Sequence, residues 1–285
     1  MIYYYAHTGH KIGLERARRG ISILRKLREA GKEVQLLVND FRAGVAMKEE
    51  QGWPEYVTIE TIQDIDAIAQ NGDSVIIDSD EDDHGRLVKY VSDFKKVMRF
   101  AHDPSDSSVH GEMLFVPECH SDSCLEAVVI DEQYFKQCEK EKRVLFFLGD
   151  YDHDKTILGN ESFFKAFDME LLLGHYFFVK YEDDLAKCFA ALHEPEEYVE
   201  LLTGSDTVVT ASAQAALEAK ASGAKVIYMD IGRPALYPMS LMEHYGIRIV
   251  HGFDASALSE ALAAPMPEAS SVLKPYQIEE ILAHV

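Results

Sequence analysis

Short apolar runs and longer amphipathic segments alternate along the chain. The short runs are rich in β-branched and aromatic residues, whereas the longer segments repeat apolar positions every three or four residues. The first pattern predicts strands and the second predicts helices. Strands are expected at 2–6, 33–38, 74–78, 96–101, 112–116, 127–130, 143–148, 171–179, 207–210, 225–229 and 247–251, and helices at 14–30, 87–94, 163–167, 198–202, 213–222, 256–263 and 278–283.

This alternation predicts the fold class. Strands that alternate with helices form βαβ units and mostly parallel sheets. The charged stretch 131–142 has little sustained apolar content, and the pattern restarts after it. A chain of 285 residues also suits two domains. We predict an α/β protein with two Rossmann-like domains, at 1–136 and 142–285, whose parallel sheets face each other across a cleft.

The overall charge excludes some partners. The chain has 28 basic and 49 acidic residues and a formal net charge of -21. Such a field repels phosphate, so neither nucleic acid nor an anionic membrane is an expected partner. No apolar run is long enough to span a membrane, and the N-terminus lacks the pattern of a signal peptide. The four cysteines match no disulfide or zinc pattern, so we expect a cytoplasmic protein with reduced thiols.

One segment reverses the overall charge. Seven cations follow the first predicted strand and only Glu15 opposes them: Lys11, Arg16, Arg18, Arg19, Arg25, Lys26 and Arg28. A helix N-terminus after a strand offers backbone N–H groups and a positive dipole end, and Gly9 and Gly13 would let a ligand approach. The pattern predicts a site for phosphate, diphosphate or carboxylate. The alternative is a solvated basic helix face that pairs with acids elsewhere.

A second candidate site follows the strand expected at 207–210. Thr210, Ala211 and Ser212 are small residues at the entry to a helix, where backbone N–H groups and hydroxyls bind phosphate. Glu218 lies further into that helix, within expected reach of ribose hydroxyls. The alternative is a small-residue helix packed tightly on its sheet.

These segments resemble a known group of enzymes. The strand, small polar turn and helix with Glu218, followed by Ala-Ser-Gly-Ala-Lys-Val-Ile-Tyr at 221–228, look like the nucleotide-binding half of GT-B-fold nucleotide-sugar enzymes. Residues 7–13 resemble the opening of the UDP-sugar hydrolase of pseudaminic acid biosynthesis, whose pattern is G-x-G-H-x-x-R. Gly9 and His10 match this pattern. His7 replaces its first glycine and Gly13 its arginine, while Arg16 lies one helical turn later.

The resemblance implies roles for several residues. It places the catalytic base on His10 and the nucleotide on the C-terminal domain. His7 and His102 are further candidates for the base from their positions after predicted strands. Lys11 or Arg16 would neutralise the leaving diphosphate, and Gly149 would form a phosphate-facing turn. The resemblance implies no cofactor and no metal. The acidic loops at 78–84 and 150–154 lack the glycine and distal glutamate of a calcium loop, so we interpret them as solvated loops. The alternative is a divalent ion that bridges these acids to a diphosphate.

Three functions remain open from the sequence. The first is an enzyme acting on a nucleotide sugar, with a UDP-sugar as its small-molecule partner. It would be a glycosyltransferase or a UDP-sugar hydrolase in surface glycan or flagellin sugar metabolism. The second is a non-catalytic relative that binds or assembles through the same fold. The third is an unrelated doubly wound protein, because fold does not determine function.

Overall fold

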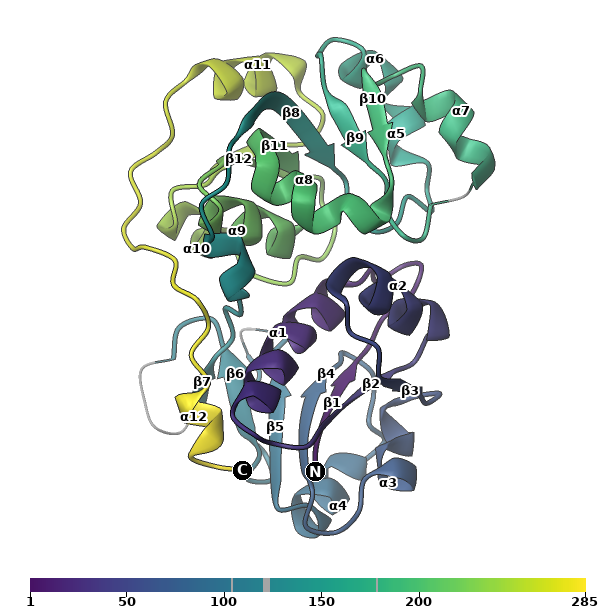
Figure 1. Ribbon diagram of the computed structural model, residues 1–285, viewed down its shortest axis with the longest axis vertical. Helices are drawn as coiled ribbons and strands as arrows, with labels where there is room; N and C mark the ends of the chain where they lie inside the picture. The colour runs from purple at the N-terminus through teal and green to yellow at the C-terminus, as the bar shows by residue number, and fades with distance from the viewer. Residues whose placement is uncertain (104, 120–123, 178) are drawn as a thin grey trace. The chain divides into compact units, whose positions relative to one another are not determined.

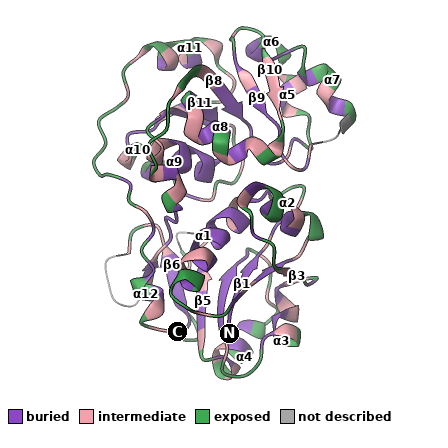
Figure 2. Cartoon of the chain, viewed as in Figure 1, coloured by how far each residue is buried: buried purple, intermediate pink, exposed green. Residues whose placement is uncertain are grey.

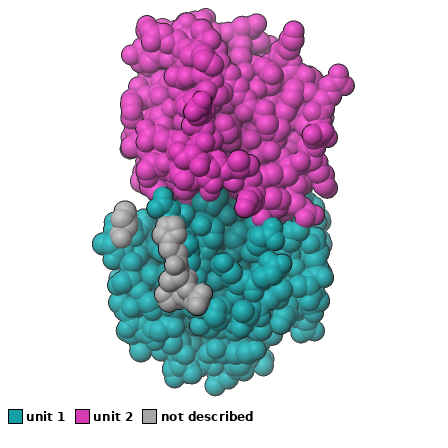
Figure 3. Space-filling view, turned by 90° about the vertical axis from the view of Figure 1, so that its left-hand side faces the viewer, with its two compact units in different colours: residues 1–129, 276–285 teal, residues 130–275 magenta. Residues whose placement is uncertain are grey.

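The computed structural model describes residues 1–285 except 104, 120–123 and 178. It divides into two compact units, coloured separately in Figure 3. The N-terminal unit comprises residues 1–129 and 276–285, and the C-terminal unit comprises residues 130–275. The sequence had placed 276–285 in the second domain, but the buried side chains of Tyr276, Ile278 and Ile281 belong to the first unit.

The N-terminal unit is built on a parallel sheet of seven strands in the order β3-β2-β1-β4-β5-β6-β7 (Figure 1). The strands are β1 (Ile2–Ala6), β2 (Val34–Val38), β3 (Tyr56–Thr58), β4 (Ser74–Asp78), β5 (Lys96–Phe100), β6 (Met113–Val116) and β7 (Cys124–Glu126). The helices are α1 (Glu15–Glu29), α2 (Phe41–Gln51), α3 (Ile65–Ile68), α4 (Arg86–Asp93) and α12 (Glu279–Leu282), with a 3-10 turn η1 (Ile62–Asp64).

Helices cover both faces of this sheet, which explains why β1 is apolar throughout and β4 is buried along its whole length. Tyr3 and Tyr5 pack into a cluster with residues of η1, α3 and α4. Tyr4 points to the opposite face, where Gly20 of α1 lies against its ring. All five residues of β1 and all five of β4 are buried (Figure 2). Strands buried on both faces show continuous apolar runs instead of alternation.

The C-terminal unit has a parallel sheet of six strands in the order β10-β9-β8-β11-β12-β13. The strands are β8 (Glu141–Phe147), β9 (Glu170–Leu172), β10 (Ala191–His193), β11 (Ser205–Thr210), β12 (Lys225–Asp230) and β13 (Arg248–His251). The helices are α5 (Thr156–Gly159), α6 (Glu161–Phe164), α7 (Glu182–Leu185), α8 (Tyr198–Gly204), α9 (Ala213–Ala221), α10 (Met239–His244) and α11 (Ala255–Ala263), with 3-10 turns η2 (Glu132–Phe135), η3 (Val179–Tyr181) and η4 (Pro195–Glu197).

The strand orders confirm two Rossmann-like units. Counted within each unit, both sheets run 3-2-1-4-5-6, and the first sheet adds a seventh strand at its edge. The order reverses between β1 and β4 in one sheet and between β8 and β11 in the other. In doubly wound sheets ligands bind beyond the carboxyl ends of the strands at such a reversal.

One predicted strand is absent, and another is shorter than predicted. Residues 127–130 are buried but form no strand, and the paired strand β7 lies just before them. The run 171–179 contains strand only up to Leu172. Periodicity alone does not separate a buried irregular segment from a strand, because both are apolar.

The expectation of reduced thiols is also wrong in part. Cys119 and Cys124 form a disulfide, with their Cα atoms 5.7 Å apart. Cys119 follows β6 and Cys124 begins β7, and these two strands pair. That proximity comes from the pairing of the strands, which the five-residue spacing did not indicate. Cys138 and Cys188 are free.

Candidate functional site

The sequence-predicted residues of the N-terminal unit lie at its reversal of strand order. The loop after β1 carries His7, Gly9, His10 and Lys11, and the loop after β4 carries Asp80. Strand register places Ala6 beside Asp78, so the two loops begin side by side. The backbone N–H of His7 donates to the carbonyl of Asp78 at 2.9 Å, which continues this alignment past the strand end.

His7 forms a closely bonded group with Asp80 and Arg16. The distance from His7 Nδ1 to Asp80 Oδ1 is 2.7 Å, and that from Arg16 Nη1 to the same oxygen is 2.6 Å. The hydrogen bond from His7, aided by Arg16, lowers the pKa of Asp80 far below its usual range despite partial burial. A carboxylate at this distance requires a hydrogen on Nδ1, so we assign this tautomer to His7.

Asp78, at the end of β4, is a fully buried carboxylate with several partners. Arg19 of α1 donates to both of its oxygens at 2.5 and 2.6 Å, and Tyr4 donates to Oδ2 at 2.7 Å. Burial alone would raise the pKa of Asp78, but Arg19, then His102 and Arg16, outweigh it and hold that pKa below its usual range. The expectation that this acidic loop is solvated is therefore wrong for its first residue.

His102, the third candidate histidine, follows β5. Its Nε2 lies 3.5 Å from Asp78 Oδ1 and has no hydrogen-bond partner among the described residues. Burial lowers the pKa of His102 to about 4, although the charge of Asp78 opposes this. His102 is therefore neutral near pH 7.

The basic run that follows is paired rather than free. Arg18 is buried and donates to both oxygens of Glu50, at 2.8 and 2.7 Å. Arg19 is bonded to Asp78 and lies 3.7 Å above the ring of Phe100. Arg28 contacts Glu55. These arginines pair with acids on other elements, as the alternative expected, but Arg18 and Arg19 are buried instead of solvated.

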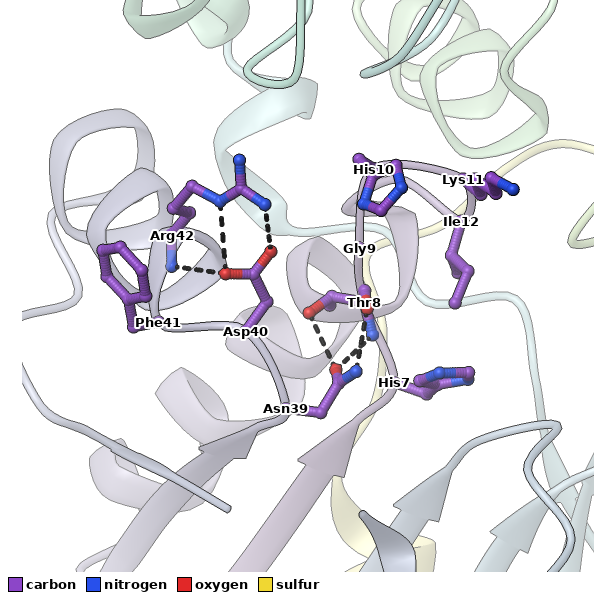
Figure 4. A pocket seen from close by; sticks show the side chains of 10 residues that line it. All are labelled: His7, Thr8, Gly9, His10, Lys11, Ile12, Asn39, Asp40, Phe41 and Arg42. Atoms are coloured by element: carbon purple, nitrogen blue, oxygen red, sulfur yellow. Dashed lines mark hydrogen bonds and ion pairs between the residues drawn. The ribbon is translucent and has the colours of Figure 1, made fainter. Parts of the chain in front are cut away.

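A pocket of about 530 Å³ opens at the ends of β1 and β2 (Figure 4). Its lining combines predicted residues with new ones: His7, Thr8, Gly9, His10, Lys11, Ile12, Asn39, Asp40, Phe41 and Arg42. Gly13 and Arg16 are not in this lining. Gly13 closes the loop instead, because its N–H donates to the Gly9 carbonyl at 2.8 Å and its φ is +88°. Both glycines adopt positive φ, which suits a turn without a side chain.

Sequence reasoning missed residues 39–42 because it predicted no helix there. The signal was present at both ends of α2. Asp40 is its N-cap and accepts from the N–H of Arg42 at 3.0 Å, and Gly52 ends the helix with a φ of +64°. An Asp before a helical segment and a Gly after it are ordinary start and stop signals.

The predicted residues of the C-terminal unit also lie at its reversal of strand order. Gly149 follows β8 with a φ of +128°, Thr210 ends β11, and Ala211 and Ser212 follow it. Thr210 Oγ1 accepts from the N–H of Ser212 at 3.0 Å, and the Ser212 hydroxyl caps α9 by accepting from Ala215 N at 3.1 Å. Ala211 is half-buried between them. The two hydroxyls thus hold the turn in shape.

Glu218 does not occupy the open position that the resemblance implies. Its side chain is buried, and it accepts hydrogen bonds from Tyr198 Oη at 2.6 Å and from Gln214 Nε2 at 2.8 Å. Ribose hydroxyls would have to replace these partners. The small-residue helix is packed tightly on its sheet, as the alternative held for this segment.

The second acidic loop has a structural role. Asp152 is buried, caps α5 by accepting from Thr156 N at 2.6 Å, and accepts from Tyr181 Oη at 2.6 Å. Arg233, after β12, donates to Thr156 Oγ1 at 2.7 Å and joins the two loops. Across the part of the chain that is described, no three His, Cys, Asp or Glu side chains are grouped to hold a metal.

Comparison with known proteins shows the fold. No protein-family model matches the sequence, and no curated protein matches it either. UDP-GlcNAc 2-epimerase from Methanocaldococcus jannaschii, in complex with UDP-GlcNAc and UDP, is similar with a TM-score of 0.57 and 13% identity over 92% of both chains. AviGT4, a glycosyltransferase of avilamycin A biosynthesis, is similar with a TM-score of 0.53 and 13% identity over 93% of this chain and 89% of that one.

Two further structures extend this similarity. UDP-GlcNAc 2-epimerase from Neisseria meningitidis bound to UDP-GlcNAc has a TM-score of 0.54 at 12% identity, covering 92% of this chain and 90% of that one. Arabidopsis thaliana UGT89C1 complexed with UDP-L-rhamnose has a TM-score of 0.51 at 9% identity, covering 92% and 89%. The chain therefore has the fold of the GT-B glycosyltransferases and of UDP-GlcNAc 2-epimerase. Within its described residues no helix is long and apolar enough to cross a membrane.

Proposed function

We propose that this protein is an enzyme that acts on a UDP-sugar, as a glycosyltransferase or a nucleotide-sugar hydrolase. The observation that carries the proposal is the position of the candidate residues. In both units they follow the two strands between which the sheet order reverses, where doubly wound folds bind ligands. Similar structures contain UDP-GlcNAc or UDP-L-rhamnose. A role in surface glycan or flagellin sugar metabolism rests on the sequence resemblance alone.

His7 is the proposed catalytic base. Asp80 orients its ring and fixes the Nδ1–H tautomer, so that Nε2 accepts the proton of an acceptor hydroxyl or of water. The oxygen that loses this proton attacks the anomeric carbon, and the bond from that carbon to the nucleotide diphosphate breaks. The resemblance instead assigns the base to His10, which is exposed at the pocket. His10 remains the alternative base.

The proposed diphosphate site is the turn from Thr210 to Ser212 with the first turn of α9, faced by Gly149. A helix N-terminus supplies backbone N–H groups and a positive dipole end. Arg16 is left out of this site because its guanidinium is bonded to Asp80. Glu218 is left out because its carboxylate is buried and bonded.

Nucleotide binding is the first test. A UDP-sugar or UDP should raise the midpoint of thermal unfolding, since a ligand that binds only the folded state stabilises it. CMP-sugars and ADP serve as comparison nucleotides. If none of these raises the midpoint, the nucleotide-sugar proposal is wrong.

The second test separates the two histidines. His7→Gln should lower the rate of UDP release from a UDP-sugar by about 10²- to 10⁴-fold, the usual contribution of a general base, while UDP still raises the unfolding midpoint. His251→Gln is the matched control, because His251 is exposed and lies outside both sites. A large loss in His10→Gln with full activity in His7→Gln would move the base to His10.

A non-catalytic binding protein is the second candidate function. Gly13 replaces the arginine of the related pattern, and Arg16 is held by Asp80. Both observations favour a related protein that binds the nucleotide sugar but does not convert it. Binding of UDP with no UDP release from any UDP-sugar, in the unaltered protein, would support this candidate.

A further inference from the structure

We propose that the pocket of the N-terminal unit binds an anionic sugar, one that carries a carboxylate or a phosphate ester, as the second substrate. This inference rests on the proposed function, and it names the chemistry of the acceptor. It is carried by the charges and hydrogen bonds of the residues that line the pocket.

Two neutral polar side chains of the pocket, Thr8 and Asn39, are already hydrogen-bonded to each other's residue. Asn39 Oδ1 accepts from the N–H of Thr8 at 2.7 Å and from its hydroxyl at 3.1 Å. Asn39 Nδ2 donates to the Thr8 carbonyl at 3.0 Å. Figure 4 shows this pair at the base of the pocket, between the ends of the two strands. It joins the two loops and leaves little hydrogen-bonding capacity on Thr8 and Asn39 for a ligand.

The charged groups of the lining have an excess of cations. Lys11 and Arg42 are positive and Asp40 is the only carboxylate among the ten lining residues, so the formal charge is +1 with both histidines neutral. Asp40 is itself covered, because Arg42 Nη2 donates to its Oδ2 at 3.2 Å and the N–H of Arg42 to its Oδ1 at 3.0 Å. Lys11 is exposed, and it forms no ion pair with any residue that the structure describes.

This local excess occurs in a chain whose net charge is -21. The field of the whole protein repels anions, and the exposed cations of the pocket oppose that field locally. A neutral sugar would gain nothing from these cations. The side chain of Arg42 is 55% exposed, although it contacts Asp40. A carboxylate or phosphate is the group that an arginine and a lysine recognise together.

The pocket also offers a surface for the sugar ring. Phe41 begins α2, lines the pocket and is 61% exposed. An exposed aromatic ring beside polar groups suits a ligand with one apolar face and a polar edge. Phe41 and the cations together fit an acidic sugar or a sugar phosphate better than a free inorganic anion.

The test compares a neutral sugar with two anionic derivatives of it that are altered at C6. Glucose, glucuronate and glucose 6-phosphate are titrated at low ionic strength, with binding measured by NMR in the millimolar range. The charged sugars should bind about three to ten times more tightly than glucose, as expected for one or two exposed charge contacts. The glucuronate and glucose 6-phosphate arms distinguish a carboxylate from a phosphate. Equal binding of all three sugars, or no binding of any, would overturn the proposal.

Matched variants locate the effect. Lys11→Met and Arg42→Met should each remove most of the preference for charged sugars, with Arg42→Met the stronger because it also uncovers Asp40. Lys48→Met removes the same charge from an exposed position of α2 outside the pocket and should leave the preference unchanged.

A parallel titration with UDP separates this inference from the proposed function. Lys11→Met should weaken the charged sugars more than UDP, because the proposed diphosphate site is the turn from Thr210 to Ser212. If it weakens UDP and not the charged sugars, the cations serve the nucleotide and the inference is wrong. If the unaltered protein binds charged sugars but no nucleotide, the proposed function fails and the pocket chemistry stands.

Discussion

At the residue scale, the carboxylate of Asp78 joins three strands and a helix. It accepts from Tyr4 of β1 and Arg19 of α1, and His102 after β5 lies beside it. The carboxylate is fully buried, so its charge depends on these partners. The loops that carry His7 and Asp80 begin beside Asp78. The buried ion pair of Asp78 and Arg19 therefore positions His7, the candidate base.

Asp78→Asn should lower the free energy of unfolding by about 3–5 kcal/mol, because it leaves the Arg19 guanidinium buried without a counter-charge. Urea unfolding measures the change. Asp82→Asn is the control, since Asp82 lies in the same loop but its side chain is 75% exposed, and it should shift stability by less than about 0.5 kcal/mol. Equal effects of the two variants would contradict the role of Asp78.

His102 should make stability depend on pH. Its pKa is lowered to about 4 by burial, whereas the unfolded chain has the ordinary value of 6.5. The unfolded state therefore binds the proton first as pH falls, and the stabilisation present above pH 6.5 is lost progressively down to about pH 4. When the pH falls from about 7.5 to about 5, the free energy of unfolding should decrease by about 2 kcal/mol less in His102→Asn than in the unaltered protein. Parallel pH curves for the two proteins would contradict this assignment.

At the element scale, α1 lies close to the sheet because Gly20 faces the ring of Tyr4. A Cβ built on Gly20 would lie 2.4 Å from Tyr4 Cε1, closer than real contacts allow. The same approach places Arg19 against Asp78. The packing of α1 on β1 therefore determines where the arginines of the basic run find their partners.

Gly20→Ala should lower the free energy of unfolding by about 1–3 kcal/mol, the usual cost of overpacking a core. Gly204→Ala is the matched control, because nothing lies within 4 Å of a Cβ at that helical position. It should be neutral or slightly stabilising, since alanine favours a helix over glycine. Denaturant midpoints measure both, and an unchanged midpoint for Gly20→Ala would show that the ring of Tyr4 can move aside.

Helix α2 shows where sequence reading failed at this scale. The strands and helices with strong periodicity were predicted within a residue or two, including β1, α1, β4 and α9. Helix α2 was not predicted, although it carries Phe41 and Arg42 of the pocket. Its apolar positions give a weak pattern because Ala43, Gly44 and Ala46 are small and pack closely, Gly44 against Tyr56.

At the scale of the whole molecule, the chain returns to its first unit after completing the second. Residues 276–285 belong to the N-terminal unit, and Ile281 of α12 is fully buried there. Lys32 also donates to the carbonyl of Val285 at 3.1 Å. The stability of the N-terminal unit therefore depends on residues far away in the sequence.

Ile281→Ala should destabilise the N-terminal unit by about 2–5 kcal/mol through the lost apolar contacts and the cavity left behind. Hydrogen exchange should show the loss of protection in the strands of residues 1–129, with residues 130–275 little changed. Val272→Ala is the control, because Val272 is 78% exposed. A loss of protection confined to residues 130–275 would contradict the division into units.

The sequence by itself determined the two Rossmann-like units and the loops that carry the candidate residues. Apolar periodicity is a local property, and sites in this fold follow strand ends. Only the tertiary structure decided which charges remain available. Arg16 and Arg19 pair with acids that lie 64 and 59 residues away in the sequence. Glu218 accepts a hydrogen bond from Tyr198, whereas Lys11 is exposed. Side-chain pairing depends on distances that the folded sheet creates, so the chain order did not reveal it.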